Sequence, residues 1–271
     1  VRATDGRVVW DVTGYGDLTG DAPDTVNPSL WRQAQLDLAH GLFEIAPGFF
    51  QVRGLDLSNM TIVEGDEGIV VIDPLISDET AAAALAMYRA ERGDRPVTAL
   101  VYTHSHIDHF GGARGVLPDG EPGDVPIVAP EHFTVHAVSE NLTAGPAMAR
   151  RAAYMYGAAL DKGPLGQMTA GLGPYNSTGT VSLIPPTIDV THTGQELVLD
   201  GIRIVFQMTP GAEAPAEMNF HFPDHRVLCM AENATHNLHN VVTLRGALVR
   251  DARAWSRFLD EAIGLFGADT D

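Results

Sequence analysis

Short apolar runs separated by turn residues dominate the chain after residue 40. They fall into two series, the first at 42–45, 49–52, 60–63, 69–72, 97–102 and 126–129, and the second at 181–184, 188–190, 196–199, 202–208, 220–222 and 226–230. Such runs, bounded by Gly, Pro and Asp, predict strands. The turn Gly-Asp-Glu-Gly at 65–68 separates two of the runs as a hairpin would.

Other stretches have helical character. Ser77 or Asp78 is expected to cap a helix that runs through Ala-rich sequence to Tyr88 and ends at Gly93. Residues 131–160 are predicted to be helical, and an amphipathic helix over 249–266 is expected near the end. The Gly-rich stretch 163–179 fits either a mobile lid or a long connection. Strands alternating with helices predict an α/β fold.

The first forty residues differ from the rest. They are rich in Gly, Asp, Pro and Thr, and we predict an extended arm followed by a short helix at 31–40, where Trp31, Ala34 and Leu38 share a face. Residues 41–271 are predicted to form one catalytic domain. The start at Val1, without an initiator Met or a hydrophobic signal core, suggests a processed or trimmed form.

Metal-binding side chains are concentrated directly after the run 97–102. Residues 103–112 read Thr-His-Ser-His-Ile-Asp-His-Phe-Gly-Gly and contain His104, His106, Asp108 and His109. Imidazole and carboxylate groups bind divalent metals such as zinc at about 2 Å. A tight turn can aim these side chains in two directions, so we expect the loop to serve two metals about 3.5–4 Å apart. Histidines that are merely solvated in a polar loop are the alternative. The glycine pair fits a backbone that must turn without a side chain in the way.

This segment resembles the His-x-His-x-Asp-His motif of the metallo-β-lactamase superfamily. The resemblance implies an α/β fold, the αββα sandwich, and leaves the reaction open because one scaffold hosts many hydrolases. It also implies that Asp73, at the end of the run 69–72, supports the metal loop, since ligating histidines generally need an outer partner. A helix or turn cap is the alternative role of Asp73.

Two later strand ends deliver Glu213 and Glu232 where the superfamily generally places histidines. Four longer motifs accompany them: Asn-Pro-Ser-Leu-Trp-Arg-Gln at 27–33, Asp-Leu-Ser-Asn-Met at 56–60, Ala-Arg-Arg-Ala-Ala-Tyr-Met-Tyr-Gly at 149–157 and Ala-Glu-Asn-Ala-Thr-His-Asn-Leu-His-Asn at 231–240. With these motifs the chain looks like the zinc-dependent alkylsulfatases. That resemblance implies hydrolysis of alkyl sulfate esters such as dodecyl sulfate to alcohol and inorganic sulfate.

The resemblance assigns ligands for two Zn²⁺ ions: His104, His106 and Glu213 for the first, Asp108 and His109 for the second, and Glu232 as the bridge. Glu217 is an equally near candidate to Glu213, and either could be a surface charge. The family supplies one further histidine to the second zinc from a His-His-Trp-Pro segment beyond the closing helix. The chain stops at Asp271 before such a segment. We therefore expect the C-terminal portion of the fold to be missing, and a homodimer to form through a part that is not in this chain.

Asn233, Thr235 and Arg245 are the predicted sulfate contacts. The planar guanidinium of Arg245 matches sulfate oxygens, and a surface salt bridge is its alternative role. His236 and His239 could support the metal ligands or pack in the core.

The resemblance implies attack by a zinc-bound hydroxide, with Asp108 and Glu232 assigned as catalytic. Attack at sulfur expels an alkoxide, which needs a general acid, and attack at carbon expels sulfate; the sequence leaves both open. The alkyl tail needs an apolar cleft, which we place at 148–172. The alternatives are another hydrolase of this fold, acting on a lactone, thioester or phosphoester, and an inactive metal-binding half that awaits its C-terminal part.

Charge and composition limit the kinds of partner that the chain can bind. The formal charge is −18, from 35 acidic and 17 basic residues, which argues against nucleic acid because phosphate binding needs a positive face. No apolar run reaches the roughly 20 residues that span a bilayer. Cys229 is the single cysteine and reads as a buried strand residue. The family resemblance suggests a secreted or periplasmic bacterial protein.

Overall fold

The computed structural model describes residues 1–16, 18–235 and 240–271. Seven strands form one sheet in the order β1-β2-β3-β4-β5-β6-β7, and four form a second in the order β11-β10-β9-β8. Their bounds are β1 (Gly41–Ala46), β2 (Phe49–Arg53), β3 (Met60–Glu64), β4 (Ile69–Ile72), β5 (Val97–Val101), β6 (Ile127–Pro130), β7 (Ile188–Val190), β8 (Glu196–Leu199), β9 (Ile202–Met208), β10 (Met218–Phe222) and β11 (Val227–Cys229). Strands β1 to β4 pair antiparallel, β4 to β7 pair parallel, and the second sheet is antiparallel.

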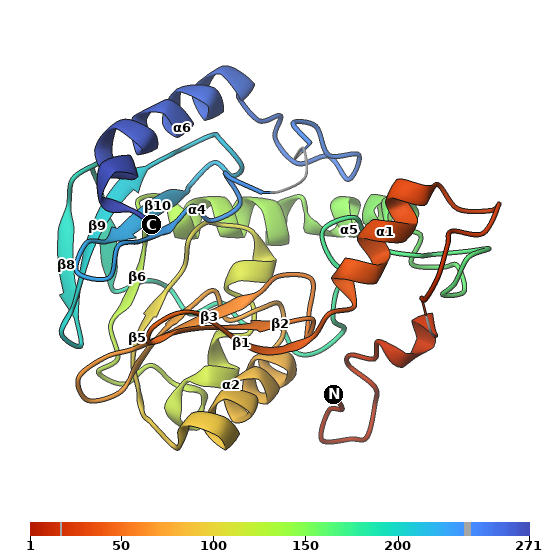
Figure 1. Cartoon of the computed structure of the whole chain (residues 1–271), viewed down its shortest axis with the longest axis horizontal. Helices are drawn as coiled ribbons and strands as arrows, with labels where there is room; N and C mark the ends of the chain where they lie inside the picture. The colour runs from red at the N-terminus through yellow and green to blue at the C-terminus, as the bar shows by residue number, and fades with distance from the viewer. Residues whose placement is uncertain (17, 236–239) are drawn as a thin grey trace.

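Helices cover the outer faces of the two sheets. The helices are α1 (Pro28–Asp37), α2 (Asp78–Arg92), α3 (Ala113–Val116), α4 (Phe133–Val138), α5 (Gly145–Met155) and α6 (Ala252–Phe266), with shorter helical turns η1 (Thr13–Tyr15), η2 (Ile107–His109), η3 (Pro118–Gly120), η4 (Ser139–Thr143) and η5 (Gly267–Asp269). Figure 1 shows α2 and α6 on opposite sides of the strands. In the described part of the chain, no helix has both the length and the apolar character to cross a membrane.

The core lies between the two sheets and between the first sheet and its helices. Phe49, Val70 and Ile72 of the first sheet pack in one cluster with Phe206 and Phe220 of the second. A second cluster joins the opposite face of the first sheet to α2, α3 and α4. On the far side, α6 buries its apolar face, Trp255 and Phe266 included. The predicted αββα sandwich is therefore confirmed.

Helix α2 follows from its sequence. Acidic Asp78 and Glu79 occupy its first turn and basic Arg89 and Arg92 its last, which complements the helix dipole. Gly93 ends the helix with a φ of 93°, a conformation that favours glycine.

Two expected elements differ in the structure. Residues 181–184 form no strand; Ser182 instead binds Gly111 through its main chain and Asp78 through its side chain, while Ile184 packs in the core. The expected helix at 131–160 is divided into α4, the π-helical turn η4 and α5. Cys229 ends β11 and is only partly buried.

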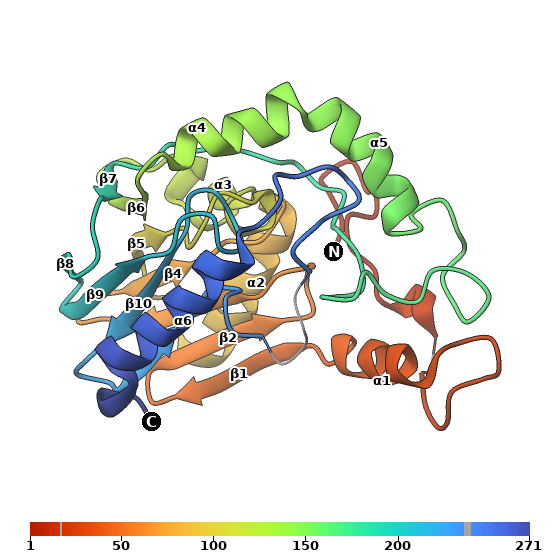
Figure 2. The ribbon, with the colours of Figure 1, turned by 90° about the horizontal axis from the view of Figure 1, so that it is seen from above.

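The amino-terminal arm lies against the Gly-rich stretch. Trp10 stacks on Tyr175 with ring centroids 4.6 Å apart, and Lys162 Nζ lies 4.0 Å from the Tyr175 ring. Figure 2 shows α1 and α5 at the same end of the molecule, beyond the ends of the sheets. The proposed division of the chain at residue 40 stays a prediction.

Asp56 joins three segments that are distant in sequence. Its buried carboxyl accepts hydrogen bonds from Thr80 Oγ1 at 2.8 Å, Ser177 Oγ at 2.6 Å and Ser177 N at 3.0 Å. Burial raises the pKa of Asp56 despite these donors. Ser58, in the same loop, donates to the carbonyl of Asp108, so this network also supports the metal loop.

We expect Asp56→Ala to lower the free energy of unfolding by about 3 kcal/mol or more, because several buried donors lose their acceptor. Asp56→Asn keeps one acceptor oxygen and should cost less. Urea denaturation measures both. Asp94→Ala, which removes a largely exposed partner of Arg89, should change stability by less than about 0.5 kcal/mol. Equal losses for Asp56→Ala and Asp94→Ala would contradict the role of Asp56.

Candidate metal centre

The loop after β5 is fastened to the second sheet by its main chain. Ser105 N donates to the Ala216 carbonyl at 3.1 Å, and Met218 N donates to the Thr103 carbonyl at 3.0 Å. Glu213 lies in the turn between β9 and β10, just before this contact. The two sheets thus hold the loop histidines and Glu213 in a fixed relation, although more than 100 positions separate them in sequence.

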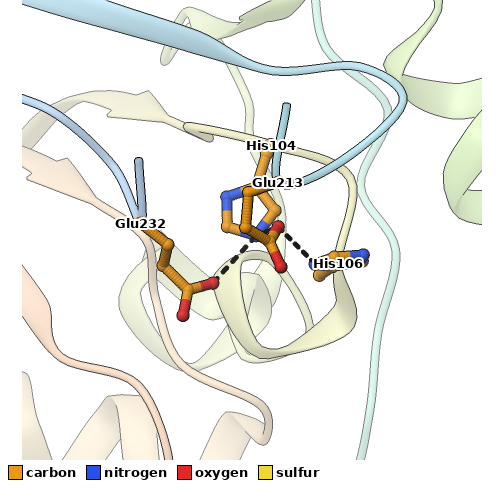
Figure 3. A group of neighbouring side chains, drawn as sticks. All are labelled: His104, His106, Glu213 and Glu232. Atoms are coloured by element: carbon orange, nitrogen blue, oxygen red, sulfur yellow. Dashed lines mark ion pairs between the residues drawn. The ribbon is translucent and has the colours of Figure 1, made fainter. Parts of the chain in front are cut away.

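Four side chains form the first candidate metal site: His104, His106, Glu213 and Glu232. Glu213 Oε2 lies 2.8 Å from His106 Nδ1 and 3.2 Å from His104 Nε2. Glu232 Oε2 lies 3.3 Å from the same nitrogen of His104. Figure 3 shows Glu232 and His106 on opposite sides of His104 and Glu213. The ligand atoms all lie within 4.8 Å of one another, so one divalent ion could contact all four residues.

Asp108, His109 and Glu232 form the second candidate site. His109 Nε2 lies 3.3 Å from Asp108 Oδ2 and 3.1 Å from Glu232 Oε2. The same oxygen of Glu232 therefore faces both His104 and His109, whose ring centroids are 3.9 Å apart. The structure brings together all six residues assigned from the sequence, in the same two sets. Their role as metal ligands stays a prediction.

Asp73 supports this loop from behind, as the resemblance implied. Its Oδ2 lies 2.7 Å from His109 Nδ1 and accepts from Thr103 Oγ1 at 2.7 Å, while its Oδ1 accepts from Thr103 N at 2.8 Å. Asp73 has a φ of 54°, in the left-handed region where Asp is one of the tolerated residues. The carboxylate thus orients the imidazole of His109 with Nε2 toward the second site.

The glycine pair that follows the loop is needed for close packing. A Cβ at Gly111 would lie 2.1 Å from the Ile76 carbonyl oxygen, and one at Gly112 would lie 2.2 Å from that of Pro74. Neither glycine has a positive φ. The physical requirement is therefore close approach of two backbones, in addition to the turn that the sequence suggested.

The donor atoms fit divalent cations. Within the described residues, the buried Nε2 atoms of His104 and His109 make no hydrogen bond of normal geometry, yet both face carboxylate oxygens. Burial opposes the ionisation of Glu213, but the charges of the nearby histidines lower its pKa to about 2. Burial likewise opposes the charge on His109, but Asp108 and Asp73 raise its pKa well above the usual range. The site therefore stabilises a positive charge at its centre, as metal binding requires.

Glu217, the alternative to Glu213, has a different place. Its Oε2 accepts from Glu213 N at 2.9 Å and from Ala214 N at 3.4 Å, and its side chain is fully buried. Burial and the neighbouring charge of Glu213 raise the pKa of Glu217 well above its usual range. Glu217 thus braces the turn that carries Glu213 and belongs to neither candidate metal site.

Arg250 and Glu140 are two site residues that the sequence did not reveal. Arg250 forms an ion pair with Glu213 and donates from Nε to the Glu213 carbonyl at 2.6 Å. The closing helix was expected to include Arg250, but α6 begins at Ala252 with Asp251 as its N-cap, which leaves Arg250 free to turn inward. Glu140 lies in η4, 3.6 Å from His106 Nε2. Neither residue belongs to a recognisable motif.

The three predicted sulfate contacts have separate locations. Arg245 lines a cavity of about 640 Å³ together with His106, Glu213 and Glu232. Thr235 is exposed and lines a second cavity of about 590 Å³. Asn233 lines neither cavity; it is buried, and its Nδ2 donates to Asn219 at 2.9 Å. Their role in substrate binding stays a prediction, and His236 and His239 lie outside the described residues.

The lining of the larger cavity is both polar and apolar. Metal-site residues and two arginines contribute to it, and its apolar part is Leu57, Ile107, Pro146, Met148, Ala149, Ala152, Met155, Ala170 and Leu172. Part of this wall comes from α5 and the Gly-rich stretch, the region in which the sequence placed an alkyl-binding cleft.

Two known proteins are similar to this chain in sequence. A linear primary-alkylsulfatase of Pseudomonas sp is 52% identical over 99% of this chain and 40% of its own length. The alkyl/aryl-sulfatase BDS1 of Saccharomyces cerevisiae is 47% identical over 98% of this chain and 42% of its own length. The chain thus spans about two fifths of the length of these relatives.

Solved structures agree with the sequence matches. The stereoselective inverting sec-alkylsulfatase Pisa1 from Pseudomonas sp. superimposes with a TM-score of 0.96 at 47% identity, over 100% of this chain and 43% of its own. A metallo-beta-lactamase from Pontibacter korlensis, 15% identical with a TM-score of 0.52, shares the fold over 85% of this chain and 88% of its own. The sequence of residues 53–265 matches the family described as the Metallo-beta-lactamase superfamily. With its sandwich of two sheets and its histidine loop at the end of β5, the chain belongs to the metallo-beta-lactamase superfamily.

Proposed function

We propose that this chain hydrolyses alkyl sulfate esters such as dodecyl sulfate to alcohol and inorganic sulfate. The observation that carries this proposal is the amphiphilic cavity, whose lining combines metal-site residues and Arg245 with apolar side chains. A sulfate ester of a long alcohol has the same division between a charged head and an apolar tail. The identity of 47–52% to alkylsulfatases supports the same substrate class.

The six candidate ligands are assigned to two metal ions. We assign His104, His106 and Glu213 to one Zn²⁺ and Asp108 and His109 to a second, with Glu232 between them, because nitrogen and carboxylate donors suit zinc. Two divalent ions bound there would acidify a water and offset negative charge. Among these ligands, Asp108 and Glu232 are the proposed catalytic carboxylates.

Substrate binding is assigned to the same cavity. The guanidinium of Arg245 is proposed to hold the sulfate, and Met148, Met155 and Leu172 to pack against the alkyl chain and exclude water. Thr235 lines the other cavity, whose lining also includes Asp108 and His109 of the second candidate metal site. The buried position of Asn233 suits a supporting role better than a direct sulfate contact.

We further propose that the reaction breaks the carbon–oxygen bond. Sulfate is a weak base and leaves with little protonation, whereas an alkoxide needs a general acid. Pisa1 is described as inverting, and inversion at a chiral carbon follows from attack at that carbon. Secretion or a periplasmic location, and assembly into a homodimer, also remain proposals that depend on the family resemblance alone.

The zinc-loaded chain is expected to release sulfate from dodecyl sulfate. His106→Ala should lower the rate at least about 100-fold, because the first site loses a ligand. His192→Ala is the matched control, since His192 is exposed and lies in neither metal site. Sulfate is measured by ion chromatography. Release that survives His106→Ala, or no release by the unchanged chain, would contradict the proposal, and a lactone, thioester and phosphoester panel would then identify another hydrolase.

Hydrolysis in ¹⁸O-labelled water should place the label in dodecanol and leave inorganic sulfate unlabelled, because attack occurs at carbon. Mass spectrometry of both products measures the distribution. Labelled sulfate, corrected for exchange in an enzyme-free sample, would show attack at sulfur instead.

Arg250→Gln should weaken zinc binding about 10–100-fold, because the substitution removes the ion pair that orients Glu213. Competition with a chromophoric chelator measures the affinity. Arg226→Gln serves as the control, since Arg226 is exposed and its ion pair is with the exposed carboxylate of Asp271. Unchanged zinc affinity in Arg250→Gln would exclude this role of Arg250.

A further inference from the structure

We propose that Glu140 makes this site select singly charged sulfate esters over doubly charged phosphate esters. This inference rests on the proposed function and concerns the charge of the head group that the cavity accepts. It would make Glu140 a specificity-determining residue that is not itself a proposed metal ligand.

The charges around the cavity single out Glu140. The described lining contains four carboxylates and two guanidinium groups: Asp108, Glu140, Glu213, Glu232, Arg245 and Arg250. Three of these carboxylates belong to the candidate metal sites, where bound cations would offset their charge. Glu140 belongs to neither site. Its negative charge therefore stays in the cavity when the metals are bound.

Glu140 also limits the positive charge that a substrate meets. Its Oε1 accepts from Arg245 Nη2 at 2.8 Å, and both side chains are largely buried, with 17% exposed. Arg250 is likewise committed to Glu213. Each arginine of the cavity thus already has a carboxylate partner. A head group bound at Arg245 therefore contacts a guanidinium whose positive charge is partly compensated by Glu140.

The position of Glu140 is built into the fold. It lies in the π-helical turn η4 between α4 and α5, where Asn141 Nδ2 donates to the Ala137 carbonyl at 2.9 Å. Single π-helical turns of this kind are frequent at functional sites. Its other oxygen lies 3.6 Å from His106 Nε2. Glu140 is therefore held between the anion-binding arginine and the metal centre, where the head group has to bind.

The electrostatic consequence depends on the charge of the head group. A sulfate ester carries one negative charge, and a phosphate monoester carries close to two above its second pKa of about 6. Each added charge is repelled by the fixed carboxylate. At a separation of about 6 Å and an effective dielectric constant of about 20, Coulomb's law corresponds to a factor of up to ~100 in relative affinity. Solvent reduces this factor, so we expect a change of about 10-fold or more.

The test compares two octyl ligands at pH 8 on the zinc-loaded chain. Octane-1-sulfonate carries one charge and octyl phosphate nearly two, and isothermal titration calorimetry gives the ratio of their affinities without any turnover. Glu140→Gln keeps an oxygen that can accept from Arg245 but removes the charge. We expect it to shift the ratio toward octyl phosphate by about 10-fold or more. Arg245→Gln, which removes the opposing charge, should shift the ratio toward the sulfonate.

Glu196→Gln is the matched control, because Glu196 also pairs with an arginine, Arg203, but is exposed and outside the cavity. It should leave the ratio unchanged. Zinc content is measured for every variant. An unchanged ratio in Glu140→Gln, or equal weakening of both ligands, would overturn the inference. If Glu140→Gln loses zinc, the test passes to Arg245→Gln. The inference is then overturned if the affinity ratio of Arg245→Gln does not move toward the sulfonate. Absence of sulfate release from dodecyl sulfate would instead contradict the proposed function, since the affinity ratio does not depend on turnover.

Discussion

The burial of acidic groups around one point is the constraint on which the rest of this structure depends. Glu213 is almost fully buried; Glu232 shares His104 with Glu213 and shares His109 with Asp108. Like charges in so little space are costly unless cations or protonated partners offset them. The imidazoles of His104 and His109 help to meet this requirement, because their Nε2 atoms lie 3.1–3.3 Å from the carboxylate oxygens.

The supporting residues act through the backbone as much as through charge. Asp73 orients His109, Glu217 binds the main chain beneath Glu213, and Arg250 binds both the main chain and the side chain of Glu213. Hydrogen bonds between the loop after β5 and the segment before β10 lock the two sheets together at the site. Contacts of this kind hold the ligating side chains in position, and such preorganisation favours tight and selective binding.

The cavity extends the same principle from metal binding to substrate. Its arginines are paired with carboxylates, and its walls are apolar, so little unpaired positive charge is offered to an anion. In a chain with a formal charge of −18, binding of the proposed anionic substrate would then depend on the metal centre and on burial of the alkyl tail. The lining of one cavity supplies polar groups for the proposed head group and apolar side chains for the proposed tail.

The sequence alone determined the strands, the metal loop and the family. Apolar runs and turn residues are local signals, so the strands β1 to β11 were predicted close to their observed bounds. Ligand-type residues at short spacing and the longer motifs also identified all six candidate ligands, including Glu213 and Glu232. The strand prediction was wrong at residues 181–184, where Leu183 and Ile184 pack in the core although no strand forms and Val181 is exposed.

Only the tertiary structure decided which polar residues serve the site. Arg250 and Glu140 lie far from their partners in sequence, and nothing in their local pattern distinguishes them from surface charges. Spacing alone does not separate Glu213 from Glu217, and the turn geometry directs the first to the histidines and the second to the backbone. Asn233 points inward, where its Nδ2 donates a hydrogen bond to Asn219. Ligand identity follows from local spacing, whereas the orientation and support of a side chain follow from contacts between distant segments, which no local pattern records.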